Sequence, residues 1–209
     1  MKIKLTKGEL KRQRDALRQY ERYLPTLQLK KQQLQLEILQ QLVALTEKKG
    51  LAGRKKETVL AWAGLFSEDS GRIKQWISPL NIATREKNVA GVNVPVFEKM
   101  DFPESDYDLF EVPLWVDYAV DALRQIIALD KEIEVLEKGI AILKHELRIT
   151  TQRVNLFEKV KIPETKEAIR VIKIYIGDQM SNAVGRSKIA KRKIEETILE
   201  ACLPAGRGR

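Results

Sequence analysis

The stretch IIALDKEIEVLEKGIAILKHELRITTQRVNLF, residues 126–157, decides the fold, because its apolar residues recur at alternating steps of three and four. This spacing is that of a coiled-coil heptad, in which one narrow apolar seam faces a partner helix. Charged residues such as Asp130, Glu134 and Lys138 fill the other faces. The seam consists of Ile126, Leu129, Ile133, Leu136, Ile140, Leu143, Leu147, Thr150, Val154 and Phe157.

A second seam with the same spacing lies near the N-terminus, so the two segments predict one long antiparallel two-helix coiled coil. Thr6 and Glu9 form a capping box that starts the first helix. Pro25 predicts a kink without a stop, and Gly50 and Gly53 predict a local break. The N-terminal seam consists of Thr6, Leu10, Gln13, Leu17, Tyr20, Leu24, Leu27, Lys31, Leu34, Ile38, Gln41 and Leu45.

The middle of the chain loses the heptad and predicts a small β-hairpin head at about 77–98. Residues 77–87 and 92–97 read as strands around the turn sequence Asn88–Gly91, and Pro95 confines its strand to an edge or a bulge. An isolated hairpin is only marginally stable, so we expect this one to pack on the helices. All three tryptophans, Trp62, Trp76 and Trp115, lie in or beside this region and are the expected contacts.

These patterns divide the chain into an N-terminal helix (1–62), a head with the hairpin and an acidic loop (63–114), a C-terminal helix (115–200) and a flexible tail (201–209). We expect an interruption at Ile162–Pro163, with Pro163 in the first turn of a continuing helix. The second helix is the longer one, and its unpaired part should begin near Val171. Because this overhang carries apolar residues, we expect another molecule to enclose it.

Charge and composition point to a soluble, cytoplasmic protein with a basic end. The net charge is +9, with +7 in residues 1–31 and +4 in residues 186–209. In an antiparallel hairpin these two segments meet at one end, which could bind an acidic protein surface, nucleic acid or anionic lipid. Cys202 is the only cysteine, which fits a reducing compartment, and the N-terminus has no apolar run of signal-peptide length.

The sequence contains no pattern of residues that predicts catalysis, a metal or a cofactor. It has no glycine-rich phosphate loop, zinc-ligand spacing or nucleophile elbow. His145 falls outside the seam and is expected at the surface. The acidic residues Asp101, Glu104, Asp106, Asp108 and Glu111 match no calcium loop and are interpreted as a solvated loop. We therefore expect a protein that acts by shape and contact and is not an enzyme.

Several stretches, in this order along nearly the whole chain, resemble the D subunit of V-type/A-type rotary ATPases. The resemblance rests on their combination, since no single stretch is diagnostic. They are LTK (5–7), RYLPTLQLKK (22–31), NVAGV (88–92), RVNLFE (153–158), IP (162–163), IYIGDQ (174–179) and RSKIAKRK (186–193).

The resemblance implies a central-stalk rotor shaft of a proton- or sodium-translocating ATPase or ATP synthase, peripheral to the membrane. The paired termini would enter the hexamer of A and B subunits, the F subunit would clasp the coiled coil, and the C subunit (d in eukaryotes) would connect the head to the membrane ring. Expected contacts with the hexamer are Lys7, Lys11, Arg12, Arg14, Arg186, Lys188, Lys191, Arg192 and Lys193. Expected contacts of the head hairpin are Val89, Val92, Val94, Val96 and Phe97.

Two other classes of protein remain open from the sequence. A nucleic-acid-binding coiled coil would use the basic end on phosphates, with a steep dependence on salt. The basic end lacks interleaved aromatic residues, which weighs against it. A prefoldin-like chaperone also combines a helical hairpin with β-hairpins, but it would need apolar rather than basic tips.

Overall fold

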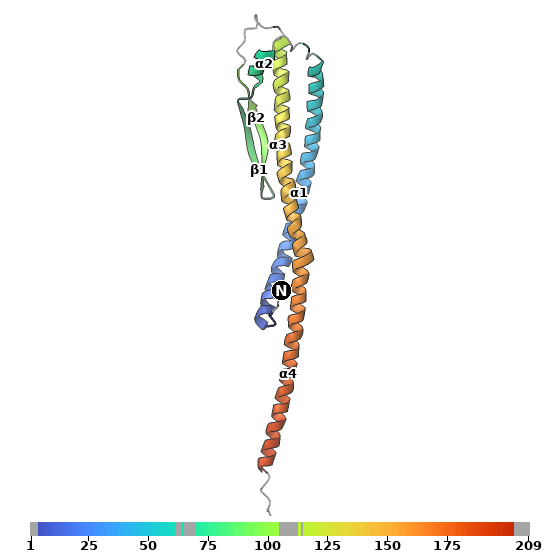
Figure 1. The fold of residues 1–209 in the computed structure, drawn as a ribbon, viewed down its shortest axis with the longest axis vertical. Coiled ribbons are helices and arrows are strands. Elements are labelled where there is room, and N and C mark those ends of the chain that lie inside the picture. Colours follow the sequence, from blue (N-terminus) through green and yellow to red (C-terminus); the bar gives the residue numbers. More distant parts are fainter. Residues whose placement is uncertain (1–3, 62–63, 65–69, 105–112, 114, 203–209) are drawn as a thin grey trace, which may run out of the picture. The chain divides into compact units, whose positions relative to one another are not determined.

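The structure is a computed structural model that describes residues 4–61, 64, 70–104, 113 and 115–202. It confirms a mainly α protein with two long helical segments and a β-hairpin in the middle of the chain. Contacts divide it into unit 1 (Met1–Thr26 and Val154–Arg209) and unit 2 (Leu27–Arg153), which are described separately. The elements are α1 (Lys7–Leu60), α2 (Ser70–Ile77), β1 (Asn81–Val89), β2 (Val92–Asp101), α3 (Trp115–Leu156), the π-helical segment η2 (Phe157–Lys161) and α4 (Ile162–Cys202) (Figure 1).

Helix α1 starts where the capping box predicts and continues through Pro25. The Glu9 amide donates a hydrogen bond to Thr6 Oγ1 over 3.3 Å. The expected break at Gly50 and Gly53 is wrong, because the helix is continuous to Leu60. Ala52, between the two glycines, is buried, and packing of this face outweighs the poor helix propensity of glycine.

In unit 2 the ion pairs between α1 and α3 show that the helices are antiparallel. Lys30 pairs with Glu146 at 2.9 Å, Lys48 with Glu132 at 2.8 Å and Lys56 with Asp130 at 2.8 Å. The residue numbers of the partners on α3 therefore fall as those on α1 rise. Each partly exposed pair contributes about 1 kcal/mol or less to stability, so their main effect is on register.

The predicted seams are the packed faces of the helices. Every seam residue from Leu10 to Leu45 and from Ile126 to Phe157 is buried or half-buried, whereas Thr6 is exposed. His145 is exposed, as its heptad phase predicts. The alternation of three and four therefore located both inner faces correctly.

The hairpin closes through a two-residue turn at Ala90 and Gly91. Their φ angles are 50° and 80°, the left-handed pair of a type I′ turn, which glycine adopts without strain. The Gly91 amide donates to Asn88 Oδ1 over 3.0 Å. The strands run 81–89 and 92–101, so the predicted strand from 77 begins too early; Ile77 is instead the last residue of α2. A register shift between Ala83 and Thr84 marks a bulge.

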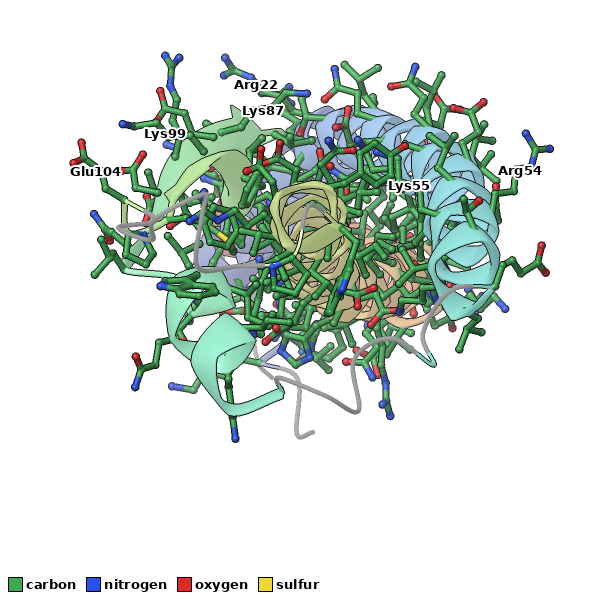
Figure 2. All side chains as sticks on the ribbon, turned by 90° about the horizontal axis from the view of Figure 1, so that it is seen from above. Arg22, Arg54, Lys55, Lys87, Lys99 and Glu104 are labelled. Carbon is green, nitrogen blue, oxygen red and sulfur yellow. The ribbon has the colours of Figure 1, made fainter. Side chains whose placement is uncertain are left out.

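The hairpin packs on the helices of unit 2 through Val94. Val94 is 1% exposed and lies in one cluster with Leu34 and Ile38 of α1 and Leu143 of α3. Seen from above, α3 lies between α1, which carries the labelled Arg54, and the hairpin, which carries the labelled Lys99 (Figure 2).

Trp76 and Trp115 have another role, since they pack α2 onto the start of α3. Their cluster contains the buried residues Ile73, Val116 and Val120. The sequence did not predict α2. Trp62 lies outside the described residues.

In unit 1, η2 shifts the packed face by one residue. Tyr20 stacks on Phe157 with ring centroids 5.4 Å apart, and Ile162 N–H donates to Phe157 O, five residues back. A regular heptad continued from Phe157 would bury positions 164, 168 and 171. Ala168 is buried, but Glu164 and Val171 are exposed, whereas Thr165, Ile169 and Ile172 are buried. The packed face is therefore displaced by one residue, which η2 absorbs. Helix α4 then begins at Ile162, as predicted.

Candidate functional site

The candidate site is the surface of unit 1 where α1 begins and α4 continues alone. Ile172 is fully buried and Ile176 is half-buried, but every residue from Gly177 to Leu199 is exposed. We call residues 177–199 the arm; at 1.5 Å per residue it extends about 35 Å. The expected start near Val171 is too early by about six residues, because α1 still lies beside Ile176.

The first part of the basic end is a shallow groove along α1 that ends at Ile176. Its volume is about 460 Å³. Lys7, Lys11, Arg14 and Arg18 follow one another at steps of four, three and four, so they lie on one face of the helix. Leu10, Asp15 and Ile176 complete the lining. The predicted residues Lys7, Lys11 and Arg14 therefore do lie together.

The second part of the basic end lies on the arm, away from that groove. Arg186 and Lys193 are ten and seventeen residues beyond Ile176, which corresponds to about 15–25 Å along the helix. The two predicted groups are thus separate patches and not one tip. Two of the arm's cations are partly neutralised, since Lys191 pairs with Glu195 at 3.8 Å and Arg192 with Glu196 at 3.4 Å. Predicted residues Arg12, Arg186, Lys188, Lys191, Arg192 and Lys193 are all exposed.

The arm also carries an apolar stripe that continues the packed face of α4. With 100° per residue, Met180, Ile194 and Ile198 project on the same side as the buried Ile172 and the half-buried Ile176. Their exposed fractions are 60%, 59% and 56%. These side chains lie beyond the first turn of α1, and none of the described residues covers them.

The valines expected to make partner contacts in the head are mostly used inside the protein. Val94 is buried, and Val89 and Val92 are half-buried against the same cluster. Phe97 is half-buried, and Val96 is 37% exposed. Among these five residues, Val96 offers the largest exposed fraction to a partner.

The described residues offer no arrangement typical of a metal site or a membrane span. No three His, Cys, Asp or Glu side chains in the described ranges gather so as to hold a metal ion. Asp101 forms an ion pair with Lys99 at 3.2 Å. The acidic residues Asp106, Asp108 and Glu111 lie outside the described residues. Among the described helices, none combines the length and apolar character that crossing a bilayer requires.

Sequence reasoning missed two structural residues of unit 2. Gly139 of α3 is buried and lies close to Val94 and Pro95 of β2. Arg124 of α3 donates from Nε and Nη2 to Trp76 O and from Nη2 to Pro103 O, and its guanidinium lies 5.4 Å from the centre of the Phe102 ring. For Gly139, the sequence did contain a signal, namely a glycine in the middle of a strong heptad. Nothing in the sequence near Arg124 reveals its remote acceptors.

Two long helical segments, a β-hairpin packed on them in unit 2, and an apolar arm that no described residue covers define a mainly helical protein with a hairpin insertion. Comparison with known proteins identifies the family: residues 9–192 match the model of the ATP synthase D subunit family, and the chain belongs to it. It is 45% identical over 193 residues to the D subunit of the V-type ATP synthase of Borreliella burgdorferi, covering 92% of this chain and 95% of that one. It is 36% identical over 197 residues to the D subunit of the V-type ATP synthase of Chlamydia abortus, covering 93% and 94%.

Proposed function

We propose that this chain is the central-stalk rotor shaft of a V/A-type ATPase or ATP synthase. It would couple ATP hydrolysis or synthesis in a hexamer of A and B subunits to rotation and to proton or sodium transport. The observation that carries the proposal is the arm, whose apolar stripe continues beyond the first turn of α1 with 56–60% of each large side chain exposed. Such a stripe is expected where a surrounding protein replaces the missing helix.

The positive charges of unit 1 support binding to a surrounding protein that presents acidic residues. The groove cations Lys7, Lys11 and Arg14 lie in the first turns of α1, and Arg186, Lys188 and Lys193 extend positive charge along the arm. Charged rims of this kind steer association and select orientation. The arm would enter the hexamer, and these cations would meet acidic residues of the A and B subunits.

The mechanism is mechanical and needs no catalytic group in this chain. A shaft whose faces differ makes unequal contacts with three chemically identical catalytic sites. Only such differences in contact free energy between states allow rotation to change which site is open. The F subunit would bind the coiled coil, the C subunit (d in eukaryotes) would connect the head to the membrane ring, and the chain would remain peripheral to the membrane.

The proposal is tested by a double variant of the arm, Met180→Glu with Ile194→Glu. Both side chains are exposed, so folding should be unaffected, but two carboxylates would be desolvated inside a sleeve. We expect at least a ten-fold loss of affinity for the A–B hexamer and a matching loss of stalk-dependent ATPase activity. Leu60→Glu is the matched control, since Leu60 is 70% exposed but lies in unit 2. Unchanged hexamer binding by the double variant would contradict the proposal.

A further inference from the structure

The arm differs from the rest of α4 in what holds its helix together. Before the arm, Ala168, Ile169 and Ile172 are buried, and Lys166 pairs with Glu21 of α1 at 3.4 Å. In the arm, every residue from 177 to 199 is exposed. Each side-chain hydrogen bond or ion pair that the described arm makes joins two residues four positions apart on α4 itself. Local interactions alone therefore support this part of the helix.

These local interactions are weak support, because the arm contains many poor helix formers. Glycine, at positions 177 and 185, has the lowest helix propensity after proline. The β-branched residues Val184, Ile189 and Ile194 lose side-chain freedom in a helix. Exposed ion pairs four residues apart add little. Most helical stability in proteins comes from packing of an apolar face, and no described residue packs on the apolar face of the arm.

The packed part of α4 decides where the arm gains or loses its helix. Forming the first turn is the costly step of helix formation, and the buried turns around Ile172 already supply it. The arm can therefore add turns outward from Ile176 or lose them from its far end. The extent of its helix depends on the helix propensity of its residues and on whether its apolar stripe is covered.

We propose that the arm completes its helix when the A–B hexamer encloses it, so that folding of the arm is coupled to assembly of the complex. Enclosure buries the stripe formed by Met180, Ile194 and Ile198, and this burial favours the helical arm. A chain whose arm is fully helical for only a fraction of the time binds with its affinity reduced by that fraction. This inference rests on the proposed function, since the hexamer is the protein that encloses the arm.

The experiment changes helix propensity on the side of the arm that faces away from the stripe. At 100° per residue, Asn182 and Gly185 project about 150° from the middle of the stripe. The variants Asn182→Ala and Asn182→Gly are compared in the full-length chain by their affinity for the purified A–B hexamer. We expect the alanine variant to bind roughly five-fold more tightly than the glycine variant, which is the preference of a helix for alanine over glycine at one position.

A second variant, Gly185→Ala, tests the same idea at another position. An added Cβ at Gly185 meets nothing within 4 Å, so the variant should bind the hexamer more tightly than the wild type. The matched control is Gly53→Ala in α1, where an added Cβ also meets nothing within 4 Å. This control should leave the affinity for the hexamer unchanged, because Gly53 lies outside the arm.

Hydrogen exchange measures the order of the arm directly. In the free chain the arm amides should exchange quickly, and exchange should be slower in Asn182→Ala than in Asn182→Gly. In the complex with the hexamer the arm amides should become protected. The amides around Ile172 should be protected in both states, because this part of α4 is packed in the free chain.

Equal hexamer affinities for Asn182→Ala and Asn182→Gly would overturn the inference, because the arm would then be fully helical before it binds. Arm amides that are as well protected in the free chain as those around Ile172 would overturn it too. A wild-type chain that does not bind the hexamer would instead contradict the proposed function and exclude the hexamer as the protein that orders the arm. The two failures are distinguishable, since exchange in the free chain is measured without the hexamer.

Discussion

Val94 of β2 lies against Gly139 of α3 so closely that a Cβ atom on residue 139 would be 2.8 Å from Val94 Cγ1. The same position is 3.6 Å from Gln41 Oε1 of α1, so α1, α3 and the hairpin meet at this glycine. The absence of a side chain at Gly139 lets the hairpin approach the helices and bury Val94. The contact fixes the hairpin within unit 2.

Gly139→Ala should destabilise unit 2, although alanine favours helix. Overpacking typically lowers stability by about 1–3 kcal/mol, which exceeds the gain of about 1 kcal/mol from helix propensity. We expect a lower melting temperature, partly restored when Val94→Ala is added. Gly53→Ala is the matched control, because nothing lies within 4 Å of its added Cβ, and it should raise the melting temperature. A rise for Gly139→Ala would show that the hairpin does not depend on this close approach.

The extra residue in η2 predicts opposite effects for two single deletions. Deleting the exposed Lys159, together with Pro163→Ala, should let η2 become regular α-helix and keep Thr165, Ile169 and Ile172 in the seam. Deleting the exposed Lys166 instead rotates Ile169 and Ile172 out of the seam by about 100°. By circular dichroism, the first variant should melt at or above the wild-type temperature and the second well below it. Similar losses in both would mean that η2 does not set the register.

Glu134 should give the protein a component of acid sensitivity. Side-chain hydrogen bonds from Lys131 and Lys138 lower its pKa to about 2 from the ordinary 4.5. Because the folded-state pKa is depressed, this stabilisation is complete above about pH 4.5 and is lost as pH falls towards 2. Glu134→Gln should lack this part of the acid-induced decrease in melting temperature, and salt should weaken it in the wild type because the Glu134 side chain is 45% exposed.

Carboxyl NMR titration provides the direct measurement of that pKa. Replacing Lys131 and Lys138 by Met should bring the pKa of Glu134 back towards its ordinary value. A Glu134 that titrates near 4.5 in the wild type would contradict the arrangement in which both lysines donate to it.

Replacing Arg124 should cause a local loss of structure in the head. Arg124→Met removes donors from Trp76 O and Pro103 O, and leaving such acceptors unpaired typically lowers stability by about 1–3 kcal/mol. Hydrogen exchange in α2 should become faster, while exchange in α1 between Leu27 and Leu45 should not change. Arg124→Lys should not restore protection, because one ammonium cannot reproduce the forked guanidinium donors. Full protection in the lysine variant would show that charge alone suffices.

The sequence predicted what depends on local periodicity and missed what depends on distant contacts. The seam from Ile126 to Phe157 was found because each step of three or four is set by helix geometry. The Val94–Gly139 contact joins residues far apart in the chain, and its partners could not be read from either segment alone. The tryptophans were assigned to the hairpin, whereas Trp76 and Trp115 hold α2, which has too few residues for a clear period.

Some features of the candidate site could likewise be predicted from the sequence, and others could not. The arm could be foreseen, since the two helices differ in length and its apolar residues are visible in the sequence. The separation of the groove around Lys11 from the cations around Arg192 could not be foreseen, because it depends on where α1 begins beside α4.

The most direct test of the rotor assignment is the stoichiometry of the complex formed on co-expression with the A and B subunits, measured by native mass spectrometry. An asymmetric shaft inside a ring of alternating subunits can be present only once. We expect a single copy of this chain in each A–B hexamer, and no copy when the chain is cut after Ile176. Three copies per hexamer, or a hexamer that forms without the chain while the chain binds duplex DNA with a steep salt dependence, would contradict the assignment.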